Sequence, residues 1–572
     1  MPATRWRAAG AASALLFLAP PALAQFRPPT LPQAIERLAP SEQPRLSPSA
    51  VPDAPEARRG PGEDRVIGLR RVELTDATVL TPAALGGTLA GLEGRDVPLR
   101  QVEEARVAIL SAFRQAGYPF VAVNATLAPA GDGRFDLRFA VVEAQVTEIR
   151  LDGDIGPAAT QALRFAEPLR RLGPLQADAL ERALLLISDI PGVTVRGILQ
   201  PVEGQAGALR LVLRLDRQAF SGLVTLDNRA FRLTGPWQAL AVLQGNSFTE
   251  FGERTEVSLY GTEEFSQRFA QVASEWFVGG SGLRIRLQAG YGESEPRGFL
   301  EALGYTGTST IAGITASYPI IRSRPANLTA TAGFDYFEGR VEADRNGANI
   351  DALDRVFALR GGLTGNLLDP GPVGPLPPGA TQAQIRLSQG LGGNTARPSR
   401  AGADGGFFKV TGEVVRNQPI AELAPGLGLT LQLLLAGQWS PDVLPFSEKF
   451  LLGGGRITRG YYAGQASGDI GWAGGVELQL EQGFDLPPLV GLPAMRMQAQ
   501  AYLFHDRGRA IQNAALERDV SLSSFGGGIR LFFERAVQIE AEVARRLERR
   551  PDGAAAPRVS PVMGFLGVVV RF

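Results

Sequence analysis

The chain has 572 residues, of which 44% are apolar and 20% charged, and its 58 basic side chains equal its 58 acidic ones in number. Balanced charge gives no reason to expect a nucleic-acid partner, and a mean hydropathy of +0.00 is too polar for a bundle of membrane helices. Because cysteine is absent and His505 is the only histidine, most hydrolase and metalloenzyme sites cannot be assembled, so we expect no enzyme activity, metal or cofactor.

The first 24 residues have the pattern of a secretory signal peptide. Arg5 and Arg7 precede an apolar stretch at 8–18, and the small residues Ala22 and Ala24 follow it. The apolar stretch is shorter than the roughly 20 residues that cross a bilayer, and it ends in the small-x-small pattern of a cleavage site. We therefore predict an exported mature chain, either a soluble protein or a β-barrel.

Residues 25–64 are predicted to form an extended, proline-rich linker. Residues 31–39 could form a short helix, which would be marginal in isolation. Whether this helix docks elsewhere in the protein stays open. The linker prolines, too closely spaced for helix or sheet, include Pro40, Pro44, Pro48, Pro52, Pro55 and Pro61.

Two modules with the order strand, helix, helix, strand, strand are predicted next, at 65–144 and 145–217. Each is large enough to close a small core, and each offers a sheet edge or helix groove to an extended polypeptide. The predicted elements are, in the first module, a strand at 66–74, helices ending at Gly94 and Gly117 and strands at 120–127 and 135–142, and, in the second, a strand at 146–151, helices at 158–172 and near 180–187, and strands near 193–199 and 209–215.

Residues 218–572 alternate between apolar and polar side chains, as transmembrane barrel strands do. The pattern is clear at 254–260, 283–291 and 537–543. This segment is too long for one ordinary soluble sandwich, whereas about 16 strands of roughly ten residues fill it. The chain ends in alternating apolar residues and Phe572, an ending that resembles the signal by which barrels reach their assembly machinery.

Two short motifs in the barrel segment carry a resemblance to a known family. One is Thr458, Arg459, Gly460 and Tyr461, and the other is Phe504, Asp506 and Gly508; further matching stretches are 188–193, 225–229 and 438–454. With the domain order, they resemble the two-partner secretion transporters of the haemolysin secretion/activation family, whose motifs read Val-Arg-Gly-Tyr and Phe-x-Asp-x-Gly. The superfamily also contains the outer-membrane barrel insertases. The resemblance implies α+β periplasmic POTRA modules followed by an all-β transmembrane barrel of about 16 antiparallel strands.

The first motif lies in a stretch, 452–476, that carries nine glycines and is predicted to be a loop free to fold back into the lumen. Phe504 and Asp506 share one face of a strand, so Asp506 could accept a bidentate contact from Arg459. Spacing alone also allows a solvated arginine and an ordinary lumen carboxylate. The resemblance implies that the pair pins the loop inside the channel. His505 would point outward, to lipid or to the membrane interface, and Tyr461 could line the pore or pack the loop.

The resemblance implies export of an unfolded exoprotein, adhesin-like or haemolysin-like and with an N-terminal secretion domain, across the bacterial outer membrane. POTRA modules in the periplasm are expected to capture it by β-augmentation. Outer-membrane lipid, the barrel assembly machinery and periplasmic chaperones are the other implied partners. One alternative is an insertase of the same superfamily, which usually carries more POTRA modules. Another is a passive porin, which has no use for them.

Overall fold

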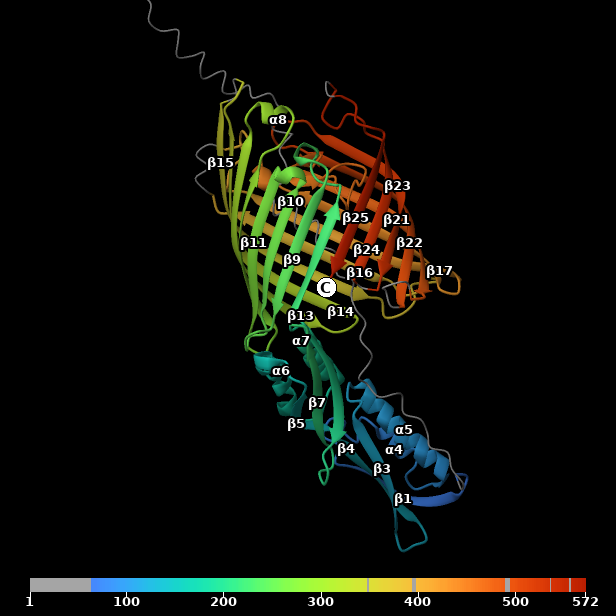
Figure 1. Cartoon of the computed structure of the whole chain (residues 1–572). Coiled ribbons are helices and arrows are strands. Elements are labelled where there is room, and N and C mark those ends of the chain that lie inside the picture. The colour runs from blue at the N-terminus through green and yellow to red at the C-terminus, as the bar shows by residue number, and fades with distance from the viewer. Residues whose placement is uncertain (1–62, 347–348, 393–397, 489–493, 535, 555–556) are drawn as a thin grey trace, which may run out of the picture.

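The computed structural model describes residues 63–346, 349–392, 398–488, 494–534, 536–554 and 557–572. The predicted signal peptide at 1–24 and nearly all of the linker at 25–64, with its short helix, lie outside these residues. The described chain forms a barrel with two small modules attached in series at one of its ends (Figure 1).

The first module is a four-stranded sheet, in the order β2-β1-β4-β3, packed against helices. Its longest helix, α5, buries the stripe Val102, Ala105, Ile109 and Phe113 against the sheet, and the spacing of three or four residues puts all four on one face of the helix. The short strand β2 is an addition to the predicted order. The elements are β1 (Val66–Thr75), α4 (Gly86–Ala90), β2 (Asp96–Pro98), α5 (Leu99–Gln115), β3 (Val121–Pro129) and β4 (Phe135–Glu143).

The second module is a three-stranded sheet in the order β5-β7-β6. The helix predicted over 158–172 is divided, because Pro168 cannot donate the backbone hydrogen bond that would continue it. No helix among the described residues is both long and apolar enough to cross a membrane. The elements are β5 (Gln145–Asp152), η1 (Gly156–Ala158), α6 (Ala159–Ala166), η2 (Glu167–Arg171), α7 (Ala177–Ser188), β6 (Val193–Pro201) and β7 (Ala208–Arg217).

The remaining chain forms a closed barrel of 16 antiparallel strands, so the predicted fold class is confirmed. The ten strands from β8 to β17, which come first in the chain, make up somewhat more than half of the wall. The bounds are β8 (Phe220–Asp227), β9 (Gln238–Asn246), β10 (Arg254–Thr262), β11 (Gln267–Val278), β12 (Leu283–Ser294), β13 (Thr306–Arg322), β14 (Ala326–Ala343), β15 (Ile350–Leu368), β16 (Ala380–Gly390), β17 (Phe408–Ala424), β18 (Leu427–Trp439), β21 (Ile470–Leu486), β22 (Met495–Ile511), β23 (Val520–Phe533), β24 (Val537–Arg546) and β25 (Val562–Arg571).

The barrel has an apolar outside and a polar inside, as a membrane barrel does. On β22 the side chains of Tyr502, Phe504 and Asp506 are buried toward the lumen, while those of Leu503 and His505 are exposed on the outer face. The same alternation runs along the neighbouring strands. His505 therefore lies on the face that the sequence predicts for it.

The first and last strands close the barrel through a short ladder. Five residues of β25, 567–571, pair with 223–227 of β8. Phe572 then extends the ladder by one more step, since its N–H donates to the carbonyl of Gly222 at 3.1 Å and its carbonyl accepts from the N–H of Gly222 at 2.9 Å. The terminal residue is thus part of the closing seam.

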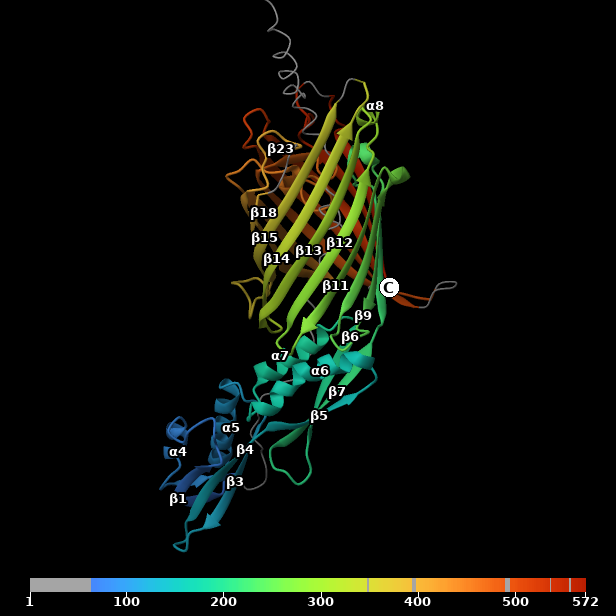
Figure 2. The ribbon, with the colours of Figure 1, turned by 90° about the vertical axis from the view of Figure 1, so that its left-hand side faces the viewer.

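The second module is docked on the turns at the nearer end of the barrel (Figure 2). Phe277 of β11 joins the module's own core, where its ring meets that of Phe165 edge-on at 5.1 Å. Gln161, fully buried, donates to the carbonyl of Gly279 at 2.8 Å, and Asp189 accepts from Arg322 at 2.6 Å. These contacts fix the module to one side of the barrel mouth.

Candidate functional site: a loop folded into the barrel lumen

A long loop, residues 440–469, leaves the far end of the barrel after β18 and returns into β21. It contains the turn η5 (Phe446–Glu448) and a small hairpin of β19 (Phe450–Leu452) and β20 (Ala466–Gly468). The prediction of a loop at 452–476 is therefore wrong at both ends.

The glycines that suggested flexibility beyond residue 469 belong to strand β21. A Cβ on Gly475 would lie 2.8 Å from the Asp506 carboxylate, and one on Gly471 would collide with the ring of Phe450. These glycines provide space for neighbouring side chains.

Arg459, at the tip of the loop, meets Asp506 on the wall. Its Nε donates to Asp506 Oδ2 at 2.8 Å, its Nη2 to Oδ1 at 2.9 Å, and its backbone N–H to Oδ2 at 3.0 Å. The ring of Phe504 lies 3.8 Å from the guanidinium carbon. Arg459 is 6% exposed and Asp506 is fully buried. The structure thus brings together one residue of the first motif and two of the second.

Two residues that the sequence analysis missed complete the tip contact. Glu477 on β21 also accepts a hydrogen bond from Arg459, and Arg530 on β23 donates to Glu477 at 2.5 Å. Arg530 lies 3.3 Å from Glu540 on β24 as well. The sequence did indicate where they point, because the alternation along each strand places both charged side chains on the lumen face, as it does for Asp506.

The other residues of the first motif shape and seat the tip. Thr458 has a φ of 53° and its hydroxyl accepts from the backbone N–H of Gly453 at 2.8 Å. Gly460 donates to Ser524 Oγ at 3.2 Å, and a Cβ there would lie 2.8 Å from the Ser524 side chain. Tyr461 is fully buried.

Tyr461 packs the loop against the wall and does not line the pore. Its hydroxyl donates to the carbonyl of Glu548 at 2.8 Å. Gly508 of the second motif has a similar spatial reason, because a Cβ there would lie 2.7 Å from Leu452 of the loop. The motif positions therefore fit one another sterically as well as electrostatically.

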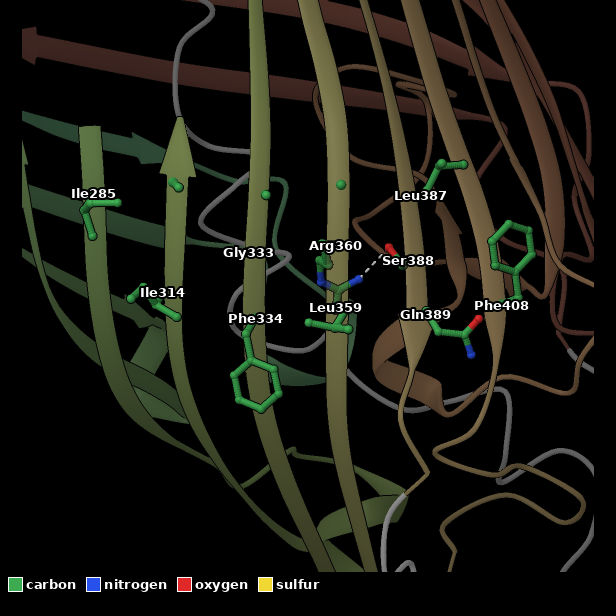
Figure 3. A pocket seen from close by; sticks show the side chains of 13 residues that line it. Ile285, Ile314, Gly333, Phe334, Leu359, Arg360, Leu387, Ser388, Gln389 and Phe408 are labelled. Carbon is green, nitrogen blue, oxygen red and sulfur yellow. Dashed lines mark hydrogen bonds between the residues drawn. The ribbon is translucent and has the colours of Figure 1, made fainter. Parts of the chain in front are cut away.

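The first arm of the loop, residues 440–452, is held by ion pairs of its own, which the sequence analysis did not predict. Glu448, 3% exposed, accepts from Arg360 of β15 at 2.8 Å and lies 2.7 Å from the ammonium of Lys409 on β17. Arg360 also donates to Asp335 of β14 at 2.6 Å. Figure 3 shows its second hydrogen bond, to Ser388 of β16 at 2.9 Å. We call Asp335, Arg360, Lys409 and Glu448 the arm cluster.

A third cluster joins the loops at the far end of the barrel. Arg400, 6% exposed, lies between β16 and β17 and contacts Asp469 at 2.6 Å and the carbonyl of Leu444 at 2.7 Å. It also pairs with Glu517, which in turn lies 2.9 Å from Lys449. Both ends of loop 440–469 are thereby tied to the loops on either side.

These contacts hold the loop from two sides. Glu448 reaches strands that precede the loop in the chain, and Arg459 reaches strands that follow it. Near the arm cluster, Leu444 packs with Val356, Ala358 and Phe407 in a small apolar cluster. The loop therefore occupies the lumen in a defined position. It is held by ion pairs that water can replace and by apolar packing of Leu452 and Tyr461 against the wall.

The chain matches known transport proteins over most of its length. The model of the family described as haemolysin secretion/activation protein ShlB/FhaC/HecB matches residues 209–531. The heme/hemopexin transporter protein HuxB of Haemophilus influenzae strain 86-028NP is 22% identical over 478 residues, which cover 82% of this chain and 81% of that protein.

Solved structures with a similar fold include two CdiB proteins. CdiB from Escherichia coli is 18% identical, with a TM-score of 0.67 over 94% of this chain and 95% of the other. CdiB from Acinetobacter baumannii is 14% identical, with a TM-score of 0.61 over 95% and 96%. BamA from Haemophilus ducreyi lacking POTRA domains 1–3 is 13% identical, with a TM-score of 0.51 over 88% and 100%. At these identities the likeness shows the fold.

Proposed function

We propose that this chain, which belongs to the haemolysin secretion/activation protein family ShlB/FhaC/HecB, moves an unfolded adhesin-like or haemolysin-like exoprotein through its barrel lumen. As a two-partner secretion transporter it exports a partner exoprotein. The observation that carries the finer proposal is loop 440–469, which is held inside the lumen by Arg459 and Asp506. A movable occupant suits a channel that must be closed at rest and admit a chain during export.

The proposed location is the bacterial outer membrane, with both modules in the periplasm. The apolar outer face of the barrel and the predicted signal peptide support it. Phe572, placed in the closing seam, is proposed to be read by the barrel assembly machinery after periplasmic chaperones have delivered the chain. This orientation puts the docked second module at the periplasmic mouth and loop 440–469 at the extracellular side.

The modules are proposed to capture the exoprotein by β-augmentation. The outer strand β3 of the first sheet is largely exposed along its length, and β5 and β6 are the outer strands of the second sheet. An extended segment can add to such an edge through backbone hydrogen bonds. Because the second module is docked at the barrel mouth, a segment held there is already beside the lumen.

A polypeptide suits this lumen better than heme, although the curated relatives are described as heme/hemopexin transporters. Proteins usually hold heme iron through His, Cys, Met or Tyr. The chain contains no cysteine, and its single histidine, His505, lies on the outer face of β22. Tyrosine and methionine are the heme ligands that the lumen still offers, so family membership decides, and we propose the exoprotein itself as cargo.

Secretion by charge-reversed variants tests the proposal. A candidate exoprotein, sought in the reading frames that neighbour this gene, is expressed with the transporter carrying Arg459→Glu, Asp506→Arg or both. Cargo in the medium and folded barrel in the membrane, detected by its heat-modifiable migration, are measured for each. We expect both single variants to insert and to lose secretion. Because Glu477 would face a reversed Arg459, the double variant should recover only part of it. Normal secretion by both single variants would overturn the proposed role of the loop.

The capture step has a separate test. A fragment of residues 64–217 should bind the unfolded secretion domain of the exoprotein with roughly micromolar affinity, because a transported segment must leave again and its ordering is costly. This fragment lacks Phe277, which packs into the core of the second module, so circular dichroism first checks that the fragment is folded. A folded fragment with no binding well above micromolar concentration would remove the capture step and leave the channel.

A further inference from the structure

The outer face of β22 changes from apolar to basic part of the way along the strand. Its outward side chains between Met495 and Leu503 are apolar, a span of nine residues that matches the length a tilted strand needs to cross the hydrocarbon core. The next outward positions, toward the end far from the modules, are His505, Arg507 and Arg509, all exposed.

On the next two strands, β23 and β24, the outer face also changes from apolar to polar or basic, and at the same height as on β22. His505 pairs with Phe525 of β23, and Phe525 pairs with Arg545 of β24. Beyond Phe525 the outward residues of β23 are serines, and beyond Val543 the outward residue of β24 is Arg545. Three adjacent strands therefore leave their apolar zone together. We call His505, Arg507, Arg509 and Arg545 the basic patch.

Aromatic rings flank the basic patch. Trp472 of β21 is opposite Arg509 in the strand register and is 43% exposed, and the guanidinium carbon of Arg545 lies 5.9 Å from the ring of Phe525. Exposed Trp and Tyr rings are enriched where the hydrocarbon core meets the head groups. The basic patch thus lies at the level of lipid head groups.

The basic patch has an excess of positive charge that other outward arginines lack. Elsewhere on the outer face Arg268 pairs with Glu293, Arg340 with Glu342, and Arg355 with Glu338. In the basic patch, by contrast, the structure records one ion pair among the described residues, between Arg509 and Asp519 at 3.0 Å. Asp519 thus balances Arg509 alone, and the basic patch keeps an excess of positive charge.

We propose that the basic patch binds the phosphate groups of a phosphorylated glycolipid of the lipid A type in the outer leaflet. This inference rests on the proposed location and orientation, and it is independent of the cargo. The guanidinium group matches phosphate with paired hydrogen bonds. An acyl chain can lie along the apolar zone below, between the rings of Trp472 and Phe525. A bound glycolipid would hold the lipid annulus beside β21–β24, the strands against which the tip of loop 440–469 is seated.

The test measures lipid binding by the purified full-length chain in detergent. The probes are lipid A with two phosphates, the same lipid with its phosphates removed, and inorganic phosphate as a competitor. We expect phosphorylated lipid A to bind best. Arg507→Gln and Arg545→Gln should each weaken it about fivefold, the contribution of one arginine near an anionic surface, and the double variant by roughly 30-fold.

Arg355→Gln is the matched control, because it removes an outward arginine that already has Glu338 as partner. Heat-modifiable migration checks that each barrel is folded, and the single variants carry the test if the double variant is not. Equal binding of both lipids, unchanged binding by the folded variants, or displacement of the lipid by millimolar phosphate would each overturn the proposal. The two proposals fail separately. Weakened lipid binding with normal secretion would support the lipid site without affecting the proposed function, whereas normal secretion by the loop variants Arg459→Glu and Asp506→Arg would overturn the role of the loop without affecting the lipid site.

Discussion

Replacing Asp506 by Asn should loosen the tip of the loop far more than replacing Glu477, the other carboxylate that accepts from Arg459, by Gln. The substitution removes one partner of a buried ion pair and leaves Arg459 with Glu477 as its charged acceptor. Removing one member of a buried pair costs about 3–5 kcal/mol. Because Glu477 still compensates part of the charge, we take the lower value, about 3 kcal/mol, which is roughly a 100-fold rise in the population of the released loop.

Two comparisons make this magnitude specific. Glu477→Gln leaves all three contacts between Arg459 and Asp506 in place, so it should raise the released population less. Glu413→Gln removes a pair between the wall and Arg456 of the same loop, whose side chain is 41% exposed. Exposed pairs are worth about 0–1 kcal/mol, so this variant is the matched control and should behave like the parent.

Labelling of a single introduced cysteine measures the released population. The chain has no cysteine, so Ala466→Cys, at a position 5% exposed in the hairpin of the loop, provides a unique reporter for an impermeant maleimide. If opening is fast and rare, the labelling rate is proportional to the released population. Equal labelling rates in Asp506→Asn and Glu413→Gln would refute the idea that the buried pair seats the loop.

Three further outcomes follow from the structure. Glu448→Gln should raise single-channel conductance in planar bilayers while leaving the barrel heat-modifiable, because Lys409 and Arg360 lose the carboxylate that holds the arm. The control is Glu338→Gln, on the outer face of β14, and equal conductance of the two variants would contradict the arm anchor. Deleting Phe572 should lower the amount of assembled barrel, since the closing ladder loses its last step; unchanged membrane levels would count against this. Asp189→Asn should increase proteolysis between the second module and the barrel, because it breaks the pair with Arg322; Glu167→Gln, in an exposed helical pair, should not.

The fold could be predicted from the sequence because its helices and strands each bury side chains at a simple, regular spacing. The helical stripe of α5 and the alternation of β22 are set by which face is buried, and both follow directly from residue order. Contacts between elements were less accessible. The docking of Phe277 into the core of the second module joins residues more than a hundred positions apart, and no local pattern marks it.

The site was predictable only in part, for a similar reason. The motif resemblance singled out Arg459 and Asp506, and the alternation put Asp506 on the lumen face. The sequence analysis predicts Gly471 and Gly475 as loop residues, because sequence does not distinguish a glycine needed for flexibility from one needed for space. Glu448 was missed because its partners, Arg360 and Lys409, lie on strands that only barrel closure brings beside it.

The clusters that hold the loop fix its position more than they stabilise it. Taking charges out of water is costly, so a buried pair gains little net energy, although removing one partner is strongly destabilising. The arm cluster is balanced, with Arg360 and Lys409 against Asp335 and Glu448. When the intact loop leaves, both sides of every pair can regain water in the wet lumen, whereas a mutant leaves one charge behind. Breaking these ion pairs in the parent protein should therefore cost less than the mutational penalties suggest, which suits the proposed role of a loop that yields to a passing chain without nucleotide hydrolysis.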